Sequence, residues 1–434
     1  MEWFDGKVVL WGGDCLKVLA SFPENSIDAC VVDPPYHLSS IVKRFGGDGA
    51  APAKSNGATG VYARSASGFM GQQWDGGAIA FDPATWELVL RVLKPGAHLV
   101  SFSGTRTYHR MVCAIEDAGF EIRDQLAWMF GSGFPKSHDV SKGIDKAAGA
   151  DAAVKRMIPG ADQNKDGWEK TNGRDYIPGV EIPNTPEAAQ WEGWGTALKP
   201  AFEPIVLARK PLSEKTVAAN VLKWGTGALN IDGCRVGTED MSAQWNRSWS
   251  SNSGPLGARY PQSGRGRWPA NVVHDGSDEV VGAFPVQKSG GVPPNRPADK
   301  SRNAYGTFGG QDFPVGVGRS EGSAARFFYS AKAGANDRIG SKHPTVKPVN
   351  LMCWLCRLVT PPGGTVLDCF AGTGTTGEAA FREGFKAILI EREAEYIADI
   401  ERRMKLCLAG PDERARAIIK AKGEPDMTGT LFEE

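Results

Sequence analysis

Short apolar runs alternate with amphipathic segments along the first 130 residues of the chain. The runs have the length and the Val, Ile and Leu content of buried strands, and the segments between them carry helix start and stop signals. Alternation of this kind predicts an α/β fold with a doubly wound, mostly parallel sheet. Strands are expected at 7–11, 27–32, 98–102 and 121–130, and helices at 14–22, at 83–93 and up to about 119.

The same alternation returns after residue 325. Neither half of the chain has enough strands to complete a nucleotide-binding sheet by itself. The two halves are therefore expected to form one sheet, with the strand that ends at Asp33 beside the strand that ends at Asp368. The charged tail 411–434 is expected to fray. Strands are expected at 365–370 and 385–390, and helices at 349–359, 375–383 and 394–408.

Regular periodicity fades between residues 131 and 324, where Pro, Gly, Ser and Trp become frequent. We therefore interpret the chain as one domain built from residues 1–135 and 325–410, interrupted by an inserted region at 136–324. The apolar run 205–208 has strand character. The insert is therefore expected to be discontinuous, with residues 196–210 joining the sheet.

The strand expected at 27–32 ends in Asp33, two prolines and Tyr36. Open α/β sheets bind ligands at the carboxyl ends of their strands. The Asp33 carboxylate and the Pro34 carbonyl can accept the two hydrogens of an exocyclic amine there, and the tyrosine ring can stack on the base that carries it. Pro34 and Pro35 fix φ and remove N–H donors, which leaves carbonyl groups free. A tight proline turn with a packed tyrosine is the structural alternative.

A glycine-rich turn follows the strand expected at 365–370. Gly372, Gly374 and Gly377 have the G-x-G-x-x-G spacing that lets backbone approach a nucleotide-like ligand at a helix start. The next strand ends in Glu391, whose carboxylate is placed to accept hydrogen bonds from ribose hydroxyls. A NAD-dependent oxidoreductase shares these features and is one alternative, although it gives no reason for the Asp-Pro-Pro-Tyr turn.

Three ordered motifs give the chain a family resemblance: Asp33-Pro34-Pro35-Tyr36, His343-Pro344-Thr345-Val346-Lys347-Pro348 and Phe370-Ala371-Gly372-Thr373-Gly374. Over roughly residues 6–140 and 325–408 the chain resembles the β-class amino-methyltransferases of DNA. The resemblance implies a Rossmann-like methyltransferase fold, S-adenosylmethionine as methyl donor, a flipped base in double-stranded DNA and target recognition by the insert. Asp33 favours the adenine N6 amine, with cytosine N4 as the alternative. A non-catalytic DNA-binding protein is disfavoured because both active motifs are intact.

The resemblance also implies site residues. The catalytic residues are Asp33, Pro34, Pro35 and Tyr36. Lys347 is expected to pair with the cofactor carboxylate or a phosphate, and Asp14 is expected beside the adenine ring of the cofactor unless it only caps the helix at 14–22. The cofactor-binding set is Asp14, Cys15, Lys347, Asp368, Phe370, Ala371, Gly372, Thr373, Gly374, Thr375, Thr376, Glu391 and Arg392.

A basic and aromatic stretch within the insert, residues 241–274, contains no acidic residue. Arginines contact phosphates or guanine edges, and aromatic rings stack on bases. A solvated loop around packed tryptophans is the alternative. The loops 37–77 and 289–318 are expected to act as a lid over the flipped base and as a second contact arm. The expected DNA-binding residues are Arg247, Arg259, Arg265, Arg267 and Trp268.

Composition adds limits to this picture. Basic and acidic residues number 50 each, so the net charge of zero gives no support to nucleic-acid binding. The eight cysteines lie dispersed, mostly in apolar runs, and indicate reduced core residues; Cys353 and Cys356 are expected to pack on one helix face, and no metal site is expected. Signal-peptide and membrane-spanning patterns are missing, so we expect a cytoplasmic enzyme of a bacterium or phage-infected host, without membrane contact. The resemblance is also compatible with a homodimer.

Overall fold

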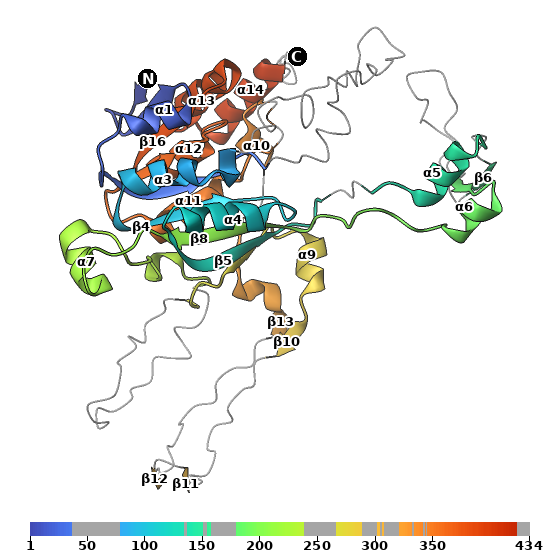
Figure 1. Ribbon diagram of the computed structural model, residues 1–434, viewed down its shortest axis with the longest axis horizontal. Coiled ribbons are helices and arrows are strands. Elements are labelled where there is room, and N and C mark those ends of the chain that lie inside the picture. Colours follow the sequence, from blue (N-terminus) through green and yellow to red (C-terminus); the bar gives the residue numbers. More distant parts are fainter. Residues whose placement is uncertain are drawn as a thin grey trace, which may run out of the picture. The chain divides into compact units, whose positions relative to one another are not determined.

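The chain forms two compact units. The larger unit joins Met1–Gly131 to Phe202–Glu434, and the smaller unit comprises Ser132–Ala201. Figure 1 shows both with their elements labelled. The computed structural model describes residues 1–36, 79–133, 137–150, 154–157, 179–237, 266–288, 302–303, 306–307, 321–331, 334–341, 343 and 345–422.

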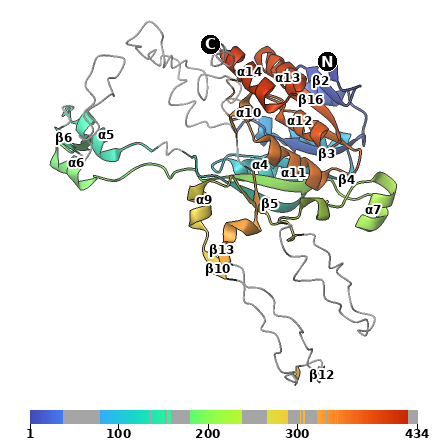
Figure 2. The same ribbon diagram turned by 180° about the vertical axis from the view of Figure 1, so that it is seen from behind.

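A ten-stranded sheet forms the centre of the larger unit (Figures 1 and 2). In spatial order its strands are β1 (Glu2–Trp3), β2 (Val8–Gly12), β16 (Lys386–Glu391), β15 (Thr365–Asp368), β3 (Ile27–Val32), β4 (Leu93–Phe102), β8 (Phe202–Arg209), β5 (Glu121–Met129), β9 (Val272–His274) and β14 (Tyr329–Ser330). Neighbours are parallel from β2 to β4 and from β5 through β9 to β14. β8 is antiparallel to both of its neighbours, and β1 is antiparallel to β2. The predicted α/β fold with a mostly parallel sheet is confirmed.

Helices cover both faces of this sheet, because successive residues of a strand point in opposite directions. In β3, Ala29 and Val31 belong to one buried cluster, which includes side chains of α11 (Val349–Val359), α12 (Thr375–Arg382) and α13 (Ala394–Leu406). Cys30 and Val32 belong to a second cluster, which includes side chains of α1 (Cys15–Ala20), α3 (Pro83–Val92) and α4 (Tyr108–Asp117). β3 is buried along its whole length, as an apolar strand between two helical layers must be.

The two ends of the chain interleave within the sheet. β15 and β16, from the second half of the sequence, lie between β2 and β3 from the first half. This order confirms the prediction that the strand ending at Asp368 lies beside the strand that precedes Asp33. Other helices of the unit are α7 (Val217–Trp224), α9 (Asp278–Ala283) and α10 (Ala335–Arg338), with 3-10 turns at Ile79–Phe81, Asp232–Cys234 and Ala324–Phe327.

The start of β4 differs from the prediction. The strand was expected at 98–102, but β4 begins at Leu93 and includes Lys94-Pro95-Gly96, a sequence typical of a helix stop. Leu93 pairs with Ile27 ahead of a register shift, so the strand resumes regular pairing only beyond the Pro-Gly dipeptide. Sheet pairing therefore overrides the local turn signal.

The predicted insert 136–324 divides between the two compact units. β8 and β9 lie inside those bounds but belong to the sheet of the larger unit, and the strand character of 205–208 indicated this for β8. The segment that separates is Ser132–Ala201, with α5 (Val140–Ala147), β6 (Val154–Met157), β7 (Gly179–Ile182) and α6 (Pro186–Gln190). Asp145 joins its helices: the carboxylate accepts hydrogen bonds from the Thr185 N–H at 3.0 Å and hydroxyl at 2.8 Å.

The carboxy-terminal tail does not fray as predicted over its first part, because residues 411–422 form α14 (Pro411–Lys422). Arg414 is buried, donates to the Leu406 carbonyl at 3.0 Å and pairs with the Glu378 carboxylate. A buried acid thus orders a charged segment that sequence composition alone marks as loose.

The expected lid at 37–77 lies outside the described residues. Within the expected arm at 289–318, the described part is the antiparallel pair β11 (Arg302–Asn303) and β12 (Gly306–Thr307). Next to it in the sequence, β10 (Val286–Lys288) pairs with β13 (Glu321–Ser323). None of the helices in the described part of the chain combines the length and apolar character that crossing a bilayer requires.

Candidate functional site

The carboxyl ends of β3 and β15 lie side by side. Cys30 pairs with Leu367 in parallel register. Asp33 and Phe370, each three positions further along, therefore leave the sheet at the same edge. The Asp-Pro-Pro-Tyr turn and the glycine turn come from opposite ends of the sequence, and the fold brings them together where open α/β sheets bind ligands.

The glycine turn between β15 and α12 curves tightly. Gly372 has a φ of +51° and Gly374 a φ of +77°, a region that L side chains rarely adopt. A Cβ on Gly374 would lie 3.0 Å from Cγ1 of Ile400, and one on Gly377 would lie 2.7 Å from Cδ1 of Leu389. The first two glycines shape the turn, and the third lets α12 pack closely on β16.

Two largely buried acids flank the glycine turn. Asp368 accepts hydrogen bonds from the Phe370 N–H at 3.0 Å and from the Thr376 hydroxyl at 2.5 Å. Glu391, at the end of β16, accepts one from the Gly372 N–H at 2.7 Å. Burial raises the pKa of Asp368 to about 7 despite both donors, and it also raises the pKa of Glu391. Both carboxylates are thus held at the turn by uncharged donors.

A polar cluster of Asp33, Tyr36, Glu203 and Lys347, called here the Asp33 cluster, lies at the end of β3. Asp33 Oδ1 accepts a hydrogen bond from the Tyr36 hydroxyl at 2.7 Å, and Oδ2 accepts one from Lys347 Nζ at 2.6 Å. Lys347 Nζ also lies 3.1 Å from Glu203 Oε2 and 3.2 Å from Tyr36 Oη. Burial alone would lower the pKa of Lys347, but the two carboxylates outweigh it and raise that pKa above its ordinary value.

Lys347 has three partners within the protein that the sequence did not indicate. An ammonium group has three N–H donors, and the two carboxylates and the Tyr36 hydroxyl supply three acceptors. Lys347 thus pairs with Asp33 and Glu203. Its pairing with a cofactor carboxylate or phosphate stays a prediction. A buried cation requires compensating charge nearby, and the tertiary structure supplies it from strands that the motif around Lys347 does not contain.

Glu203 is a site residue that sequence reasoning missed. It stands in β8 opposite Trp128 of β5, and the Ser103 N–H donates to the carbonyl of the adjacent Pro204 at 3.0 Å. These contacts fix Glu203 beside the end of β4, the strand next to β3. The sequence did contain a signal for this residue: Glu203 is an acid near the start of a strand that was expected to join the sheet.

The remaining predicted residues near the turns are placed as follows. Asp14 caps α1 and accepts hydrogen bonds from two backbone N–H groups at 3.1 and 3.2 Å. Capping was the alternative to its predicted position beside the cofactor. The neighbouring Gly13 N–H donates to the Glu391 carbonyl at 2.9 Å, so the Asp14 turn lies next to the glycine turn. Cys15 is buried, whereas Arg392 pairs with Glu393 at the surface. A cofactor role for these residues stays a prediction.

A basic and aromatic cluster surrounds two of the predicted DNA-binding residues. Arg267 lies over the ring of Phe327 at 4.2 Å, and Trp268 is 61% exposed with Arg235 over its ring at 5.2 Å. The Arg326 guanidinium lies over the same Phe327 ring, 4.5 Å from its centre. Arg235 and Arg326 were missed because both lie outside the predicted stretch, Arg235 shortly before it and Arg326 well after it. Arg247, Arg259 and Arg265 lie outside the described residues.

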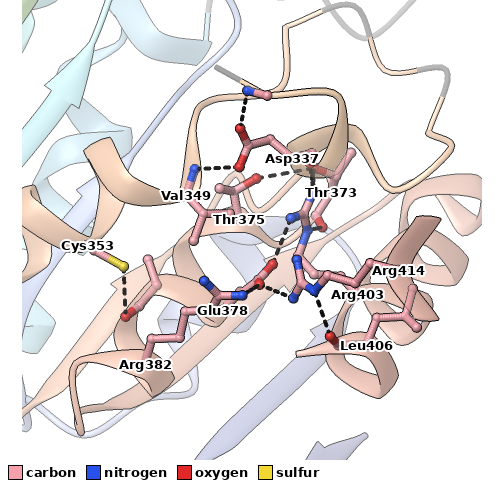
Figure 3. Close-up of polar contacts among 12 residues, drawn as sticks. Asp337, Val349, Cys353, Thr373, Thr375, Glu378, Arg382, Arg403, Leu406 and Arg414 are labelled. Carbon is pink, nitrogen blue, oxygen red and sulfur yellow. Dashed lines mark hydrogen bonds and ion pairs between the residues drawn. The ribbon is translucent and has the colours of Figure 1, made fainter. Parts of the chain in front are cut away.

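A buried network supports the glycine turn from the side of α13 (Figure 3). Arg403 is fully buried and donates to the Thr373 carbonyl at 2.6 Å, to Glu378 at 2.9 Å and to the Asp337 carbonyl at 2.6 Å. Arg382 and Arg414 pair with the same Glu378 carboxylate. Three arginines from α12, α13 and α14 thus share one buried acid, and one of them holds the backbone of the turn.

A family model described as DNA methylase (N6_N4_Mtase) matches residues 27–402. The chain belongs to the DNA methylase family. Membership confirms the expected enzyme class, a DNA methyltransferase that uses S-adenosylmethionine as methyl donor, and it decides against the oxidoreductase alternative.

Individual relatives show the same similarity. The type II methyltransferase M.HindIII of Haemophilus influenzae strain Rd is 25% identical over 260 residues, which cover 55% of this chain and 67% of the relative. M.HinfI of Haemophilus influenzae is 38% identical over 105 residues, 24% of this chain and 29% of that protein. Among solved structures, the cytosine-N4-specific PvuII DNA methyltransferase is 14% identical with a TM-score of 0.40, covering 96% of this chain and 95% of that one. The fold of the methylase is established by its own strand order.

Proposed function

We propose that the methylase transfers a methyl group from S-adenosylmethionine to the N6 amine of a flipped adenine in double-stranded DNA. One observation carries the proposal: the Asp33 turn and the glycine turn leave neighbouring parallel strands at one edge of the sheet. A donor bound at one turn and an amine bound at the other are then placed for in-line transfer. Asp33 at the head of its motif favours adenine over cytosine.

The glycine turn and its two acids fit the proposed donor. Gly372 and Gly374 allow the close backbone approach that a nucleoside requires, and a Cβ at either position would be strained. The Glu391 carboxylate suits ribose hydroxyls, and the Asp368 carboxylate suits a cationic group. The donor supplies an electrophilic methyl group on a sulfonium. Asp14, next to Glu391, would lie near the adenine ring.

The Asp33 cluster fits the proposed acceptor. The Asp33 carboxylate and the Pro34 carbonyl accept the two amine hydrogens, which frees the nitrogen lone pair from conjugation with the ring. Tyr36 stacks on the flipped base in this proposal. Its hydroxyl and Lys347 each hold one oxygen of Asp33, so the carboxylate is oriented before the base arrives. The proton leaves after the amine has become cationic, so Asp33 acts as an acceptor rather than as a strong base.

The DNA-facing surface is proposed to include Arg267 and Trp268 together with Arg235 and Arg326, because cations and an exposed aromatic ring suit phosphates and bases. Target recognition is proposed for the inserted region, including Ser132–Ala201. The enzyme is further proposed to act as a homodimer in the cytoplasm of a bacterium or phage-infected host, and light scattering of the purified protein tests the dimer.

Nucleoside mass spectrometry of DNA from an expressing host tests the reaction. The host must lack its own adenine and cytosine amino-methylation. N6-methyladenine is expected; N4-methylcytosine would establish the cytosine alternative, and the absence of both products would refute the proposal. Sequencing with detection of modified bases then reads the recognition sequence.

Replacement of the catalytic acid tests its role. Asp33→Ala is expected to abolish methylation while the Kd for S-adenosylmethionine stays within about threefold of the parent value, since the donor is held by the other turn. The exposed Asp117 at the end of α4 provides a control, and Asp117→Ala should keep both properties. Equal loss of binding and catalysis in Asp33→Ala would contradict the assignment.

A further inference from the structure

Glu203 brings a second carboxylate to the Asp33 cluster. Its Oε2 lies 3.1 Å from Lys347 Nζ and 3.3 Å from Tyr36 Oη. The cluster is shielded from solvent, since the side chains of Asp33 and Glu203 are 19% and 20% exposed and that of Lys347 is 5% exposed. Charges interact more strongly there than in bulk water. The balance of the three charges therefore affects any reaction at Asp33.

The three charges sum to −1. Lys347 alone would cancel the charge of Asp33 and weaken its carboxylate as an acceptor, whereas Glu203 restores one negative charge to the cluster. During methyl transfer the new C–N bond forms as the C–S bond breaks, the sulfur keeps the electron pair, and the amine becomes cationic. Fixed negative charge near the amine stabilises that transition state. A cluster with net charge −1 is thus better suited to the reaction than a neutral pair.

The position of the Lys347 ammonium is set by its surroundings rather than by its flexible side chain. Glu203 is fixed on β8 through pairing with β5, and Asp33 is fixed at the end of β3. The ammonium lies between these two carboxylates, 4.9 Å from the centre of the Phe102 ring and 5.5 Å from that of the Tyr36 ring. Removing the charge of Glu203 would leave Asp33 as the remaining anionic partner in the cluster.

We propose that Glu203 is a positioning residue for methyl transfer. Through Lys347 it orients the Asp33 carboxylate, and its charge keeps the cluster negative while the amine becomes cationic. The inference rests on the proposed function and deepens it, because it assigns a role in the same site to a residue that does not contact the amine.

The first test compares Glu203→Gln with the parent enzyme in single-turnover methylation at saturating DNA and donor. Gln keeps the size of the side chain and removes the charge. The transfer rate is expected to fall at least about 10-fold, while the Kd for S-adenosylmethionine stays within about threefold. The alkaline limb of the rate profile should move to lower pH, because loss of one carboxylate lowers the pKa of Lys347. Glu203→Asp, which keeps the charge, should recover part of the rate.

A double-mutant cycle with Lys347→Met tests whether Glu203 acts through the lysine. Without the ammonium, Asp33 and Glu203 repel each other. Glu203→Gln should then leave the transfer rate unchanged or raise it. Glu121→Gln is the matched control, because Glu121 also pairs with a cation on β8, Arg209 at 2.6 Å, away from the cluster. This control should keep the parent rate.

The outcomes separate this inference from the proposed function. A parent enzyme that methylates DNA and a Glu203→Gln variant that is equally fast would overturn the role of Glu203 and leave the proposed function standing. An equal rate loss from Glu203→Gln in the parent enzyme and in the Lys347→Met variant would also overturn it, because the effect would not pass through the lysine. A parent enzyme that binds the donor but methylates no DNA would instead refute the proposed function.

Discussion

Asp368 should make the stability of the methylase depend on pH. Its side chain is buried, and its two hydrogen-bond donors, the Phe370 N–H and the Thr376 hydroxyl, are neutral. Burial raises its pKa from 3.8 to about 7, and the nearby carboxylates Asp33 and Glu391 add to the shift. The folded state therefore favours the protonated acid more strongly than the unfolded state does.

The sign and size of the effect follow from these two pKa values. Below about pH 4 the acid is protonated in both states and costs nothing. Between pH 4 and 7 only the unfolded state releases the proton, so stability falls as pH rises, and above pH 7 the loss is complete. At about 1.4 kcal/mol per pKa unit, the full loss is at most about 4 kcal/mol. About 3 kcal/mol of it accrues between pH 5 and 8.

Urea unfolding of the parent and Asp368→Asn at pH 5, 6, 7 and 8 measures this loss. Asn is neutral at every pH, so other titrating groups cancel in the difference between the two free energies of unfolding. The variant should gain about 3 kcal/mol relative to the parent from pH 5 to pH 8. Thr376→Val removes one donor to the carboxylate, which raises the folded-state pKa of Asp368, so the fall in stability should extend to higher pH. A difference that stays constant within about 0.5 kcal/mol over this range would refute the reasoning.

Ionisation of Asp368 should have the opposite effect on donor binding, which should strengthen as pH rises. A cationic donor favours the ionised form of Asp368, so the affinity for S-adenosylmethionine should rise with pH up to about 7, by at most about tenfold per unit. Isothermal titration in two buffers of different ionisation enthalpy should detect a released proton near pH 6. Asp368→Asn should remove both the pH dependence and the proton. An affinity that is flat between pH 5.5 and 8 would contradict the placement of Asp368 beside the donor.

Other contacts give further predictions. Gly374→Ala should weaken donor binding at least about tenfold, measured by titration, because the residue has a φ of +77° and the new Cβ would lie 3.0 Å from Ile400; unchanged affinity would argue against a donor on this turn. Arg414→Met should lower the free energy of urea unfolding by about 2 kcal/mol, since Glu378 loses one of its three arginine partners, and no change would show that α14 does not stabilise the fold. Trp268→Ala should weaken DNA binding in a gel-shift assay by about 1 to 3 kcal/mol without changing the donor Kd, and equal DNA affinity would remove the residue from the interface.

Local patterns in the sequence determined much of the fold. Apolar runs bounded by caps and glycines gave the strands and helices around the sheet, and α11 has its predicted bounds. The predicted start of the strand at residue 98 was wrong because pairing between Leu93 and Ile27 overrides the turn signal of Lys94-Pro95-Gly96. Within the predicted insert, the apolar run 205–208 indicated β8, whereas the three-residue strand β9 was not predicted and is identified by its pairing with β5 and β14.

In the candidate site, too, some features were predictable from the sequence and others depended on the tertiary structure. Motif order predicted that the Asp33 turn and the glycine turn meet, because parallel strands of one sheet bring their carboxyl ends to one edge. The order of the motifs along the chain does not predict which side chains from different strands contact each other. The pairing of Lys347 with Asp33 and Glu203 is one such contact.

The sequence by itself determined which two turns are the candidates for the chemistry, since turn conformation and strand patterning depend on residues close together in the chain. The tertiary structure decided which charges share a site. Glu203 reaches Lys347, and Arg414 reaches Glu378, across strands and helices that are distant in sequence. The free energy of a buried charge depends on its neighbours in space, and only the packed fold supplies those neighbours.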